Sequence, residues 1–302
     1  MLYYNNMLFR SLLAAALLFA ALPTVAQTKV KAVATFSILG DLVAEIGGEK
    51  IDVVTLVGPD TDAHAYQPTP TDARALASAQ ALVSNGLGFE GWIDRLAEAA
   101  SFKGRRIVVS AGVPTLEAEK MRGRTQGPDP HCWQDVACAR RYVANIAEGL
   151  IASDPANAAY YRSHAALYDK RLADLDLWIR TEIAKVPENQ RKAITSHGAF
   201  HYFANAYGVQ FHAPRGYNTD SDPSARDVAA LIRQVREQKI KALFIENMTN
   251  PNLIRQIAHD AGGVVGPSIY SDALSKPGGP ATTYETMMRH NATALVAGML
   301  KN

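Results

Sequence analysis

The segment NAAYYRSHAALYDKRLADLDLWIRTEIAKV, from Asn157 to Val186, decides how the chain is organised. It contains neither glycine nor proline, and apolar residues recur every three or four positions for about five turns. These residues are Tyr161, Ala165, Tyr168, Leu172, Leu175 and Ile179. Asp154-Pro155 before the segment and Pro187 after it are typical start and stop signals. We therefore expect one stiff connector helix within 154–187, roughly 45 Å long, which would limit the motion of whatever it joins.

On both sides of this segment, short β-branched runs alternate with amphipathic segments, which is typical of parallel strands joined by helices. Strands are expected before it at 31–36, 52–57, 81–84 and 106–110, with helices near 40–47, 71–78, 91–99 and 134–152. Strands are expected after it at 192–195, 209–212, 242–246 and 262–269, each followed by a helical pattern. The sequence thus predicts an α/β protein with two parallel-sheet (β/α)4 lobes, at 27–153 and 188–302, joined by one long connector helix.

The N-terminus has the pattern of an export signal. Arg10 precedes an apolar run from Leu12 to Leu22, and the small residues at 23–27 suit cleavage after Ala26. The alternative is a membrane anchor, but the run is shorter than the roughly 20 residues that a spanning helix needs. We therefore interpret 1–26 as a signal peptide and expect the mature chain in the periplasm.

Composition and charge restrict the class of partner. The chain has 302 residues, 48% of them hydrophobic, and a formal net charge of +2. Its lysines and arginines form no basic block, so nothing indicates a nucleic-acid partner. No stretch after Gln27 approaches membrane-spanning length, so we expect the mature chain not to be embedded in a membrane. We expect it to be a monomer.

The chain has two cysteines, Cys132 and Cys138. Inside one helix, their Cα atoms would be roughly 9 Å apart, which is beyond the reach of a disulfide. A bridge therefore requires a non-helical Cys132, and we favour the alternative of two unlinked, buried thiols.

Three histidines and one aspartate fall at the ends of predicted strands or in the loops that follow them. His64 follows the second strand, His131 the fourth, His197 the fifth and Asp272 the eighth. Open α/β sheets bind ligands at the carboxyl ends of their strands, so two facing lobes would bring these four side chains together. Three imidazoles and one carboxylate suit tetrahedral Zn²⁺. Mn²⁺ prefers more oxygen ligands, although a bidentate Asp272 could still serve it.

The segments around these residues resemble the signature segments of the zinc and manganese ABC-transporter solute-binding proteins. The resemblance extends in order over nearly all of the mature chain. The segments are DAHAY (62–66), PHCW (130–133), TSHGAFHYFANAYG (195–208) and YSDALS (270–275).

The resemblance implies a periplasmic protein that captures a divalent metal ion for import and delivers it to the permease of an ABC transporter. Its four metal ligands would be His64, His131, His197 and Asp272. Relatives carry either His or Glu at the third position, and the Glu form is associated with manganese, so His197 favours zinc. The chain lacks the His-rich loop of many zinc-specific relatives, since 117–127 contains no histidine. Mn²⁺ or Fe²⁺ therefore remains the alternative ligand.

Other candidate residues have weaker support. Glu246 ends the seventh predicted strand, where its carboxylate could accept a hydrogen bond from a metal-bound imidazole. His201 lies one helical turn after His197, so a role beside a ligand or on the surface is open. His212 ends the sixth strand, and no family ligand falls there. For Cys132, next to a ligand, we favour a buried filler over a thiol near the metal. The remaining histidines are expected to face solvent: His164, His259 and His290.

Two other functions belong to different classes of protein, a hydrolase and an adhesin. A zinc metallohydrolase would also place His and Asp at strand ends, but it needs an open position for water, and the chain has no His-Glu-x-x-His pattern. We therefore do not expect an enzyme. The sequence neither supports nor opposes a role as an adhesin, which is sometimes claimed for relatives.

Overall fold

The computed structural model describes residues 29–116, 127–219 and 222–302. The expected signal peptide, 1–26, and most of the histidine-free segment, 117–126, lie outside the described residues. Within the described ranges, no helix is both long enough and apolar enough to cross a membrane.

The first half of the chain forms a parallel sheet with the strand order β2-β1-β3-β4. Its strands are β1 (Val30–Phe36), β2 (Ile51–Val57), β3 (Ala81–Ser84) and β4 (Arg105–Val108). The helices of this half are α1 (Ser37–Gly47), α2 (Pro70–Ala77), α3 (Ile93–Ala99) and α4 (Val136–Ser153).

The second half repeats the arrangement, with the strand order β6-β5-β7-β8. Its strands are β5 (Lys192–Ile194), β6 (Gln210–His212), β7 (Ala242–Leu243) and β8 (Val264–Val265). Its helices are α6 (His201–Tyr207), α7 (Ala225–Glu237), α8 (Asn252–Ala261) and α9 (Tyr284–Met299). The predicted fold, two parallel four-stranded sheets with helices, is confirmed.

The last two strands are shorter than the sequence indicated. We expected strands over 242–246 and 262–269, but regular pairing between β7 and β8 stops after Leu243 and Val265. Pro267 follows in the second strand and has no N–H to donate to the ladder. Pairing resumes as a single bridge between Glu246 and Ile269.

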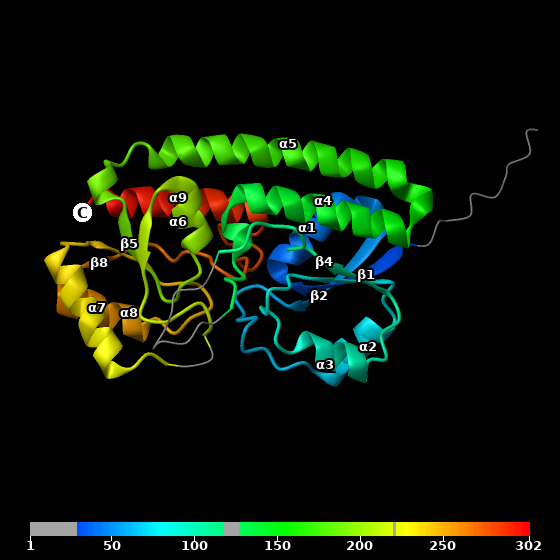
Figure 1. Cartoon of the computed structure of the whole chain (residues 1–302), viewed down its shortest axis with the longest axis horizontal. Coiled ribbons are helices and arrows are strands. Elements are labelled where there is room, and N and C mark those ends of the chain that lie inside the picture. The colour runs from blue at the N-terminus through cyan, green and yellow to red at the C-terminus, as the bar shows by residue number, and fades with distance from the viewer. Residues whose placement is uncertain (1–28, 117–126, 220–221) are drawn as a thin grey trace, which may run out of the picture.

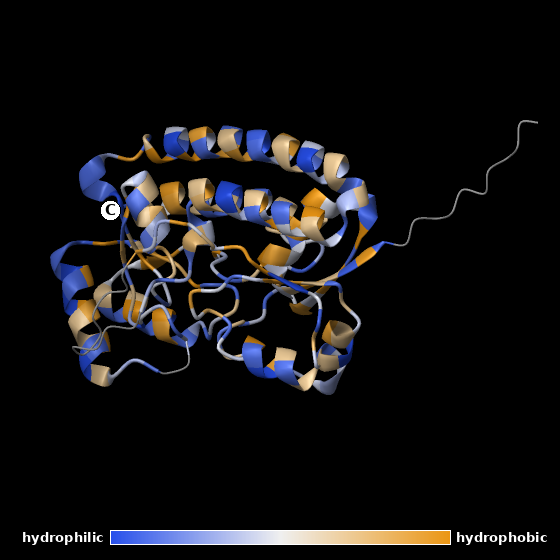
Figure 2. Cartoon of the chain, turned by 45° about the vertical axis from the view of Figure 1, so that its right-hand side comes forward, coloured by the Kyte–Doolittle hydropathy of each residue, from blue (hydrophilic) through white to orange (hydrophobic). Residues whose placement is uncertain are grey.

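Helix α5 (Ala158–Ile183) joins the two halves and lies along both of them (Figure 1). It packs on α1, α4 and α9. One side of the helix is buried, and the buried residues are Tyr161, Tyr168, Leu172, Leu175, Ile179 and Ile183. Alternating bands of hydrophilic and hydrophobic colour run along the whole helix (Figure 2). The connector helix expected from the apolar spacing is thus present.

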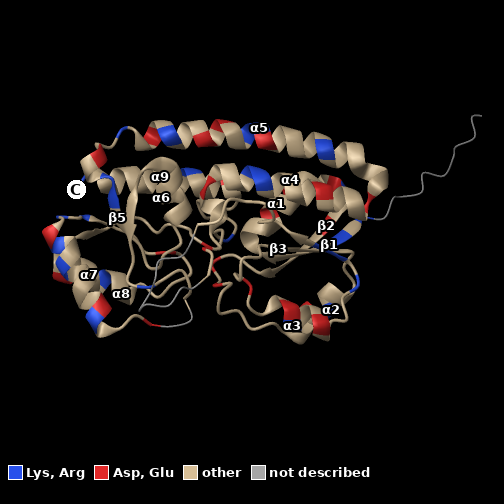
Figure 3. Cartoon of the chain, in the orientation of Figure 1, with Lys and Arg blue, Asp and Glu red and all other residues tan. Residues whose placement is uncertain are grey.

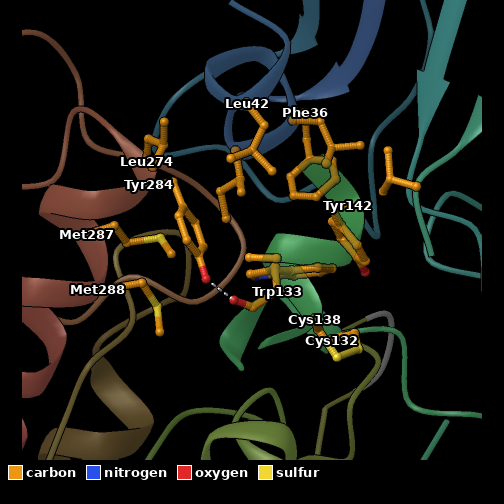
Figure 4. Packing of buried hydrophobic residues seen from close by; sticks show 14 of the residues in the cluster. Phe36, Leu42, Cys132, Trp133, Cys138, Tyr142, Leu274, Tyr284, Met287 and Met288 are labelled. Atoms are coloured by element: carbon orange, nitrogen blue, oxygen red, sulfur yellow. Dashed lines mark hydrogen bonds between the residues drawn. A yellow bond between two sulfur atoms is a disulfide. The ribbon is translucent and has the colours of Figure 1, made fainter. Parts of the chain in front are cut away.

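A single hydrophobic core extends through both halves. Phe36, Trp133 and Tyr142 from the first half pack in the same cluster as residues of α9, which comes from the second half (Figure 4). The Tyr284 hydroxyl donates a hydrogen bond of 2.7 Å to the backbone oxygen of Trp133 across this junction. A smaller second cluster lies within the C-terminal half, where β5 and β7 meet α7 and α8. The shared core indicates that the two lobes do not separate freely.

The two cysteines are bonded, so our preference for unlinked thiols is wrong. Cys132 and Cys138 form a disulfide with a Cα–Cα distance of 5.6 Å (Figure 4). Cys132 begins a 3₁₀ turn (Cys132–Gln134), and Cys138 lies in the first turn of α4. Between them, Asp135 has an extended backbone, which changes the chain direction and brings the two Cα atoms closer than a continuous helix would.

Candidate metal centre

The four candidate ligands meet where the two lobes face each other. His64 lies in the loop after β2, and His131 directly precedes the 3₁₀ turn before α4. His197 follows β5, and Asp272 follows the bridge that extends β8. Figure 3 shows acidic residues on the loops in this central region. The side chains of His131, His197 and Asp272 are fully buried, and that of His64 is only 4% exposed.

The donor atoms are spaced as the corners of a metal-coordination shell. One donor atom from each residue lies within 4.8 Å of all the others. His64 Nε2 is 3.3 Å from His131 Nε2 and 3.5 Å from Asp272 Oδ2. Asp272 Oδ1 is 3.5 Å from His131 Nε2, and Asp272 Oδ2 is 3.1 Å from His197 Nε2. In a tetrahedron with bonds of about 2.0 Å, the donors are about 3.3 Å apart, so the arrangement fits Zn²⁺.

The hydrogen bonding of these atoms also fits a bound cation. Within the described part of the chain, His197 Nε2 and both carboxylate oxygens of Asp272 are buried without a hydrogen-bond partner. A buried carboxylate is costly unless it is paired, hydrogen-bonded or bound to a metal. A cation at the centre of the four donors would satisfy these atoms.

Glu246 lies behind His197, where the sequence suggested an acceptor for a ligand imidazole. Its Oε2 is 2.5 Å from His197 Nδ1 and accepts a hydrogen bond of 2.6 Å from the Ser271 hydroxyl. Its Oε1 accepts hydrogen bonds from the backbone N–H groups of Ser196 and His197, at 2.8 and 3.0 Å. The fully buried carboxylate therefore holds both the ring and the backbone of His197 in place.

His131 has a comparable partner that the sequence reasoning missed. Asp129 Oδ1 is 2.7 Å from His131 Nδ1 and accepts a 2.9 Å hydrogen bond from the His131 backbone N–H. Asp129 Oδ2 is 2.8 Å from His201 Nδ1. The available signal was a carboxylate two residues before a candidate ligand, in the same loop at the end of the sheet.

The charges around the centre suit metal binding. Burial lowers the pKa of His131, which favours the neutral imidazole that a metal requires. Burial alone would also lower the pKa of His197, but the carboxylates of Glu246 and Asp272 outweigh it and raise this pKa well above its usual value. Burial would raise the pKa of Asp272, but His197 and His131 hold it well below its usual value. These shifts favour an anionic Asp272 and a protonated His197, so a metal that bound here would compete with a proton for His197.

The other histidines lie outside this group of four. His201 contacts Asp129, and His212 lies beside Gln234 on α7 at 3.2 Å. The sequence predicted that His164, His259 and His290 face solvent, and this is correct only for His259. His259 faces solvent, with its side chain 88% exposed. His164 is half-buried because it stacks on Tyr160, with the ring centroids 4.1 Å apart. His290 is also half-buried and bonds the Ser268 backbone oxygen at 2.8 Å.

Comparison with known proteins identifies the family. Residues 32–298 match the family model described as "ZnuA: Zinc-uptake complex component A periplasmic". The chain belongs to this family. The family predicted from the sequence segments, the periplasmic zinc and manganese solute-binding proteins, is thereby confirmed, and the chain is a substrate-binding component of a metal ABC transporter.

Relatives in this family are described with different metals. The manganese-binding lipoprotein MntA of Halalkalibacterium halodurans is 33% identical over 269 residues, which is 89% of this chain and 88% of the relative. A Mn-bound periplasmic metal-binding protein from Candidatus Liberibacter asiaticus superposes with a TM-score of 0.80 at 31% identity, covering 90% of this chain and 100% of that one. The periplasmic zinc-binding protein TroA of Treponema pallidum superposes with a TM-score of 0.84 at 28% identity, covering 90% and 99%.

Proposed function

We propose that this protein captures one divalent transition-metal ion, Zn²⁺ in preference to Mn²⁺, through His64, His131, His197 and Asp272. It then delivers the ion to the membrane permease of its ABC transporter for import. The observation that carries this proposal is the group of four donors, two from each lobe, that lie within 4.8 Å of one another. Glu246 would orient His197 for the metal. The protein would act as an exported, periplasmic monomer.

The preference for zinc rests on the donor types. Three imidazole nitrogens and one carboxylate make a four-coordinate set, which Zn²⁺ accepts, whereas Mn²⁺ prefers more oxygen. One observation favours the manganese alternative. Both oxygens of Asp272 face the centre, because Oδ1 lies 3.5 Å from His131 Nε2 and Oδ2 lies 3.1 Å from His197 Nε2. A bidentate Asp272 would give a fifth donor atom, so a relative that binds manganese can share this arrangement.

The same donor set argues against hydrolysis. A catalytic zinc keeps an open position for a water molecule. Here four protein side chains would complete a tetrahedral shell, which is suited to holding an ion and not to activating water. Relatives in this family are substrate-binding proteins of transporters, in agreement with this argument.

The proposal is tested by titrating mature protein from metal-free medium with Zn²⁺ and Mn²⁺ in competition with chelators. We expect one equivalent of metal, with zinc bound more tightly. His197→Glu should shift the preference toward manganese because it replaces a nitrogen donor with oxygen. The solvent-facing His259→Glu is the matched control and should leave both affinities unchanged. Tighter manganese binding by the wild type would overturn the choice of zinc, and absence of binding would overturn the function itself.

A further inference from the structure

The carboxylate that contacts His131 is held from the opposite lobe. Asp129 belongs to the N-terminal half and is fully buried. Its Oδ1 lies 2.7 Å from His131 Nδ1, and its Oδ2 lies 2.8 Å from His201 Nδ1. His201 is the first residue of α6, in the C-terminal half. One carboxylate therefore joins a candidate ligand in one lobe to a non-ligand imidazole in the other.

The neighbouring residue of α6 holds the backbone of the same aspartate. The Tyr202 hydroxyl donates a hydrogen bond of 3.0 Å to the Asp129 backbone oxygen and accepts one of 3.0 Å from the Leu116 backbone N–H. Two consecutive residues of α6 thus fix Asp129, one through its carboxylate and one through its backbone. This leaves the carboxylate little freedom to rotate.

His197 is held differently. Its carboxylate partner, Glu246, comes from the same lobe and bonds residues of that lobe: Ser196, His197 and Ser271. Fixing the ring of His197 therefore needs no contact from the opposite half. The ring of His131, in contrast, is fixed with the help of the opposite half, because one oxygen of its partner Asp129 is bonded to His201.

We propose that Asp129 and His201 form a positioning pair that acts across the two lobes on the metal ligand His131. This inference rests on the proposed function. His201 lies outside the group of four donors, so it does not act as a ligand. It fixes the Asp129 carboxylate, which in turn accepts the Nδ1–H of His131 and leaves Nε2 directed at the metal. Loss of His201 loosens a ligand that belongs to the other lobe.

The test compares zinc affinity, and the rate of zinc release to an excess of chelator, in four variants. His201→Leu removes the donor, and Asp129→Asn removes the charge of the acceptor. Each should weaken binding by about 10- to 100-fold, the usual effect of losing a group that orients a ligand. His201→Asn should recover most of the loss, because its side-chain N–H₂ can occupy the place of the imidazole Nδ1–H. The control His290→Asn alters a half-buried imidazole that bonds the Ser268 backbone oxygen and lies outside the group of four donors, so it should change neither the affinity nor the release rate.

Two further measurements separate positioning from general destabilisation. The double variant Asp129→Asn/His201→Leu should bind zinc about as well as Asp129→Asn alone, because the two residues act as a unit. In ¹⁵N spectra of the zinc-loaded protein, the Nδ1–H signal of His131 should shift in His201→Leu and return in His201→Asn. If His201→Leu does not fold, His201→Gln keeps the bulk of the side chain while displacing its donor and should take its place.

Failure of the positioning pair can be told apart from failure of the proposed metal-binding function. A wild type that binds no metal would contradict the proposed function. A wild type that binds zinc, with His201→Leu binding and releasing it at the same rate, would overturn the inference alone. Additive losses in the double variant, or an unshifted His131 signal, would also overturn it.

Discussion

At the scale of single residues, the four candidate ligands depend on groups outside their own set. Glu246 accepts three hydrogen bonds, from the backbone N–H groups of Ser196 and His197 and from the Ser271 hydroxyl, and its Oε2 lies 2.5 Å from Nδ1 of the His197 ring. Replacing it by glutamine introduces an N–H₂ group that faces at least one of these donors. The side chain is fully buried, so a donor left there without an acceptor is costly.

We predict that Glu246→Gln lowers zinc affinity by about 10- to 100-fold, because His197 loses the acceptor that orients it. The measurement is competition with a chelator of known affinity. Glu90→Gln is the matched control, since Glu90 is also a buried glutamate that accepts backbone N–H groups, those of Asn85 and Gly86, and it contacts none of the four donors. Equal affinity in wild type and Glu246→Gln would contradict the role of Glu246.

A second prediction at this scale concerns protons. Burial lowers the pKa of His197, but the carboxylates of Glu246 and Asp272 outweigh it and raise this pKa well above its usual value, which favours the protonated imidazole in the metal-free protein. A metal binds only the neutral imidazole, so binding must release the proton. We expect zinc affinity to rise with pH through neutrality, with about one proton released per ion at pH 7. Calorimetry in buffers of different ionisation enthalpy measures that number, and a value near zero would refute the assignment.

At the scale of elements, the segment from His131 to Cys138 links the centre to the core. His131 offers a donor atom, while Trp133 Nε1 and Gln134 Nε2 both donate to the backbone oxygen of Ser271, at 2.8 and 2.7 Å. Ser271 precedes Asp272, so this segment supports a candidate ligand in each lobe. The disulfide attaches the start of the segment to the first turn of α4.

We predict that Cys132→Ala/Cys138→Ala reduces the free energy of unfolding by about 2 kcal/mol, the loop-closure value for a bridge spanning so short a loop. Urea denaturation of the metal-free protein measures the change. Wild type treated with a dithiol reductant should match the variant, and the variant itself should not respond to the reductant. A wild type whose stability is unaffected by reduction would contradict the prediction.

The sequence predicted regular elements well and local departures poorly. Helix α5 and the approximate positions of the strands could be anticipated because apolar periodicity and β-branched runs are properties of short windows. The four candidate ligands could be placed because loops after parallel strands gather at one edge. The contact between Asp129 and His201 could not be predicted, because the two residues are 72 positions apart in the sequence and lie in different lobes. The disulfide could not either, because it depends on the extended backbone of Asp135.

At the scale of the whole molecule, the two lobes behave as one body with a site between them. They share one hydrophobic core, and α5 lies along both (Figure 1). Direct hydrogen bonds also cross the junction. Asn247 Nδ2 donates to Asp60 Oδ1 at 2.8 Å, and the Leu274 backbone N–H donates to Ser37 Oγ at 2.9 Å. A wide hinge motion would break the shared core, so metal exchange should involve the loops at the junction.

We therefore predict that zinc stabilises the protein strongly while changing its overall dimensions little. At a free zinc concentration 1,000 times the Kd, the added stability is about 4 kcal/mol, which should appear as a clear rise in Tm. Because each lobe supplies two donors, His64→Ala in one lobe and Asp272→Ala in the other should each lose most of this rise, whereas His259→Ala should retain it. Small-angle scattering should give the same radius of gyration with and without zinc, since the shared core and α5 keep the lobes in place. A marked compaction on adding zinc would show that the lobes close on the metal and that the connector does not restrain them.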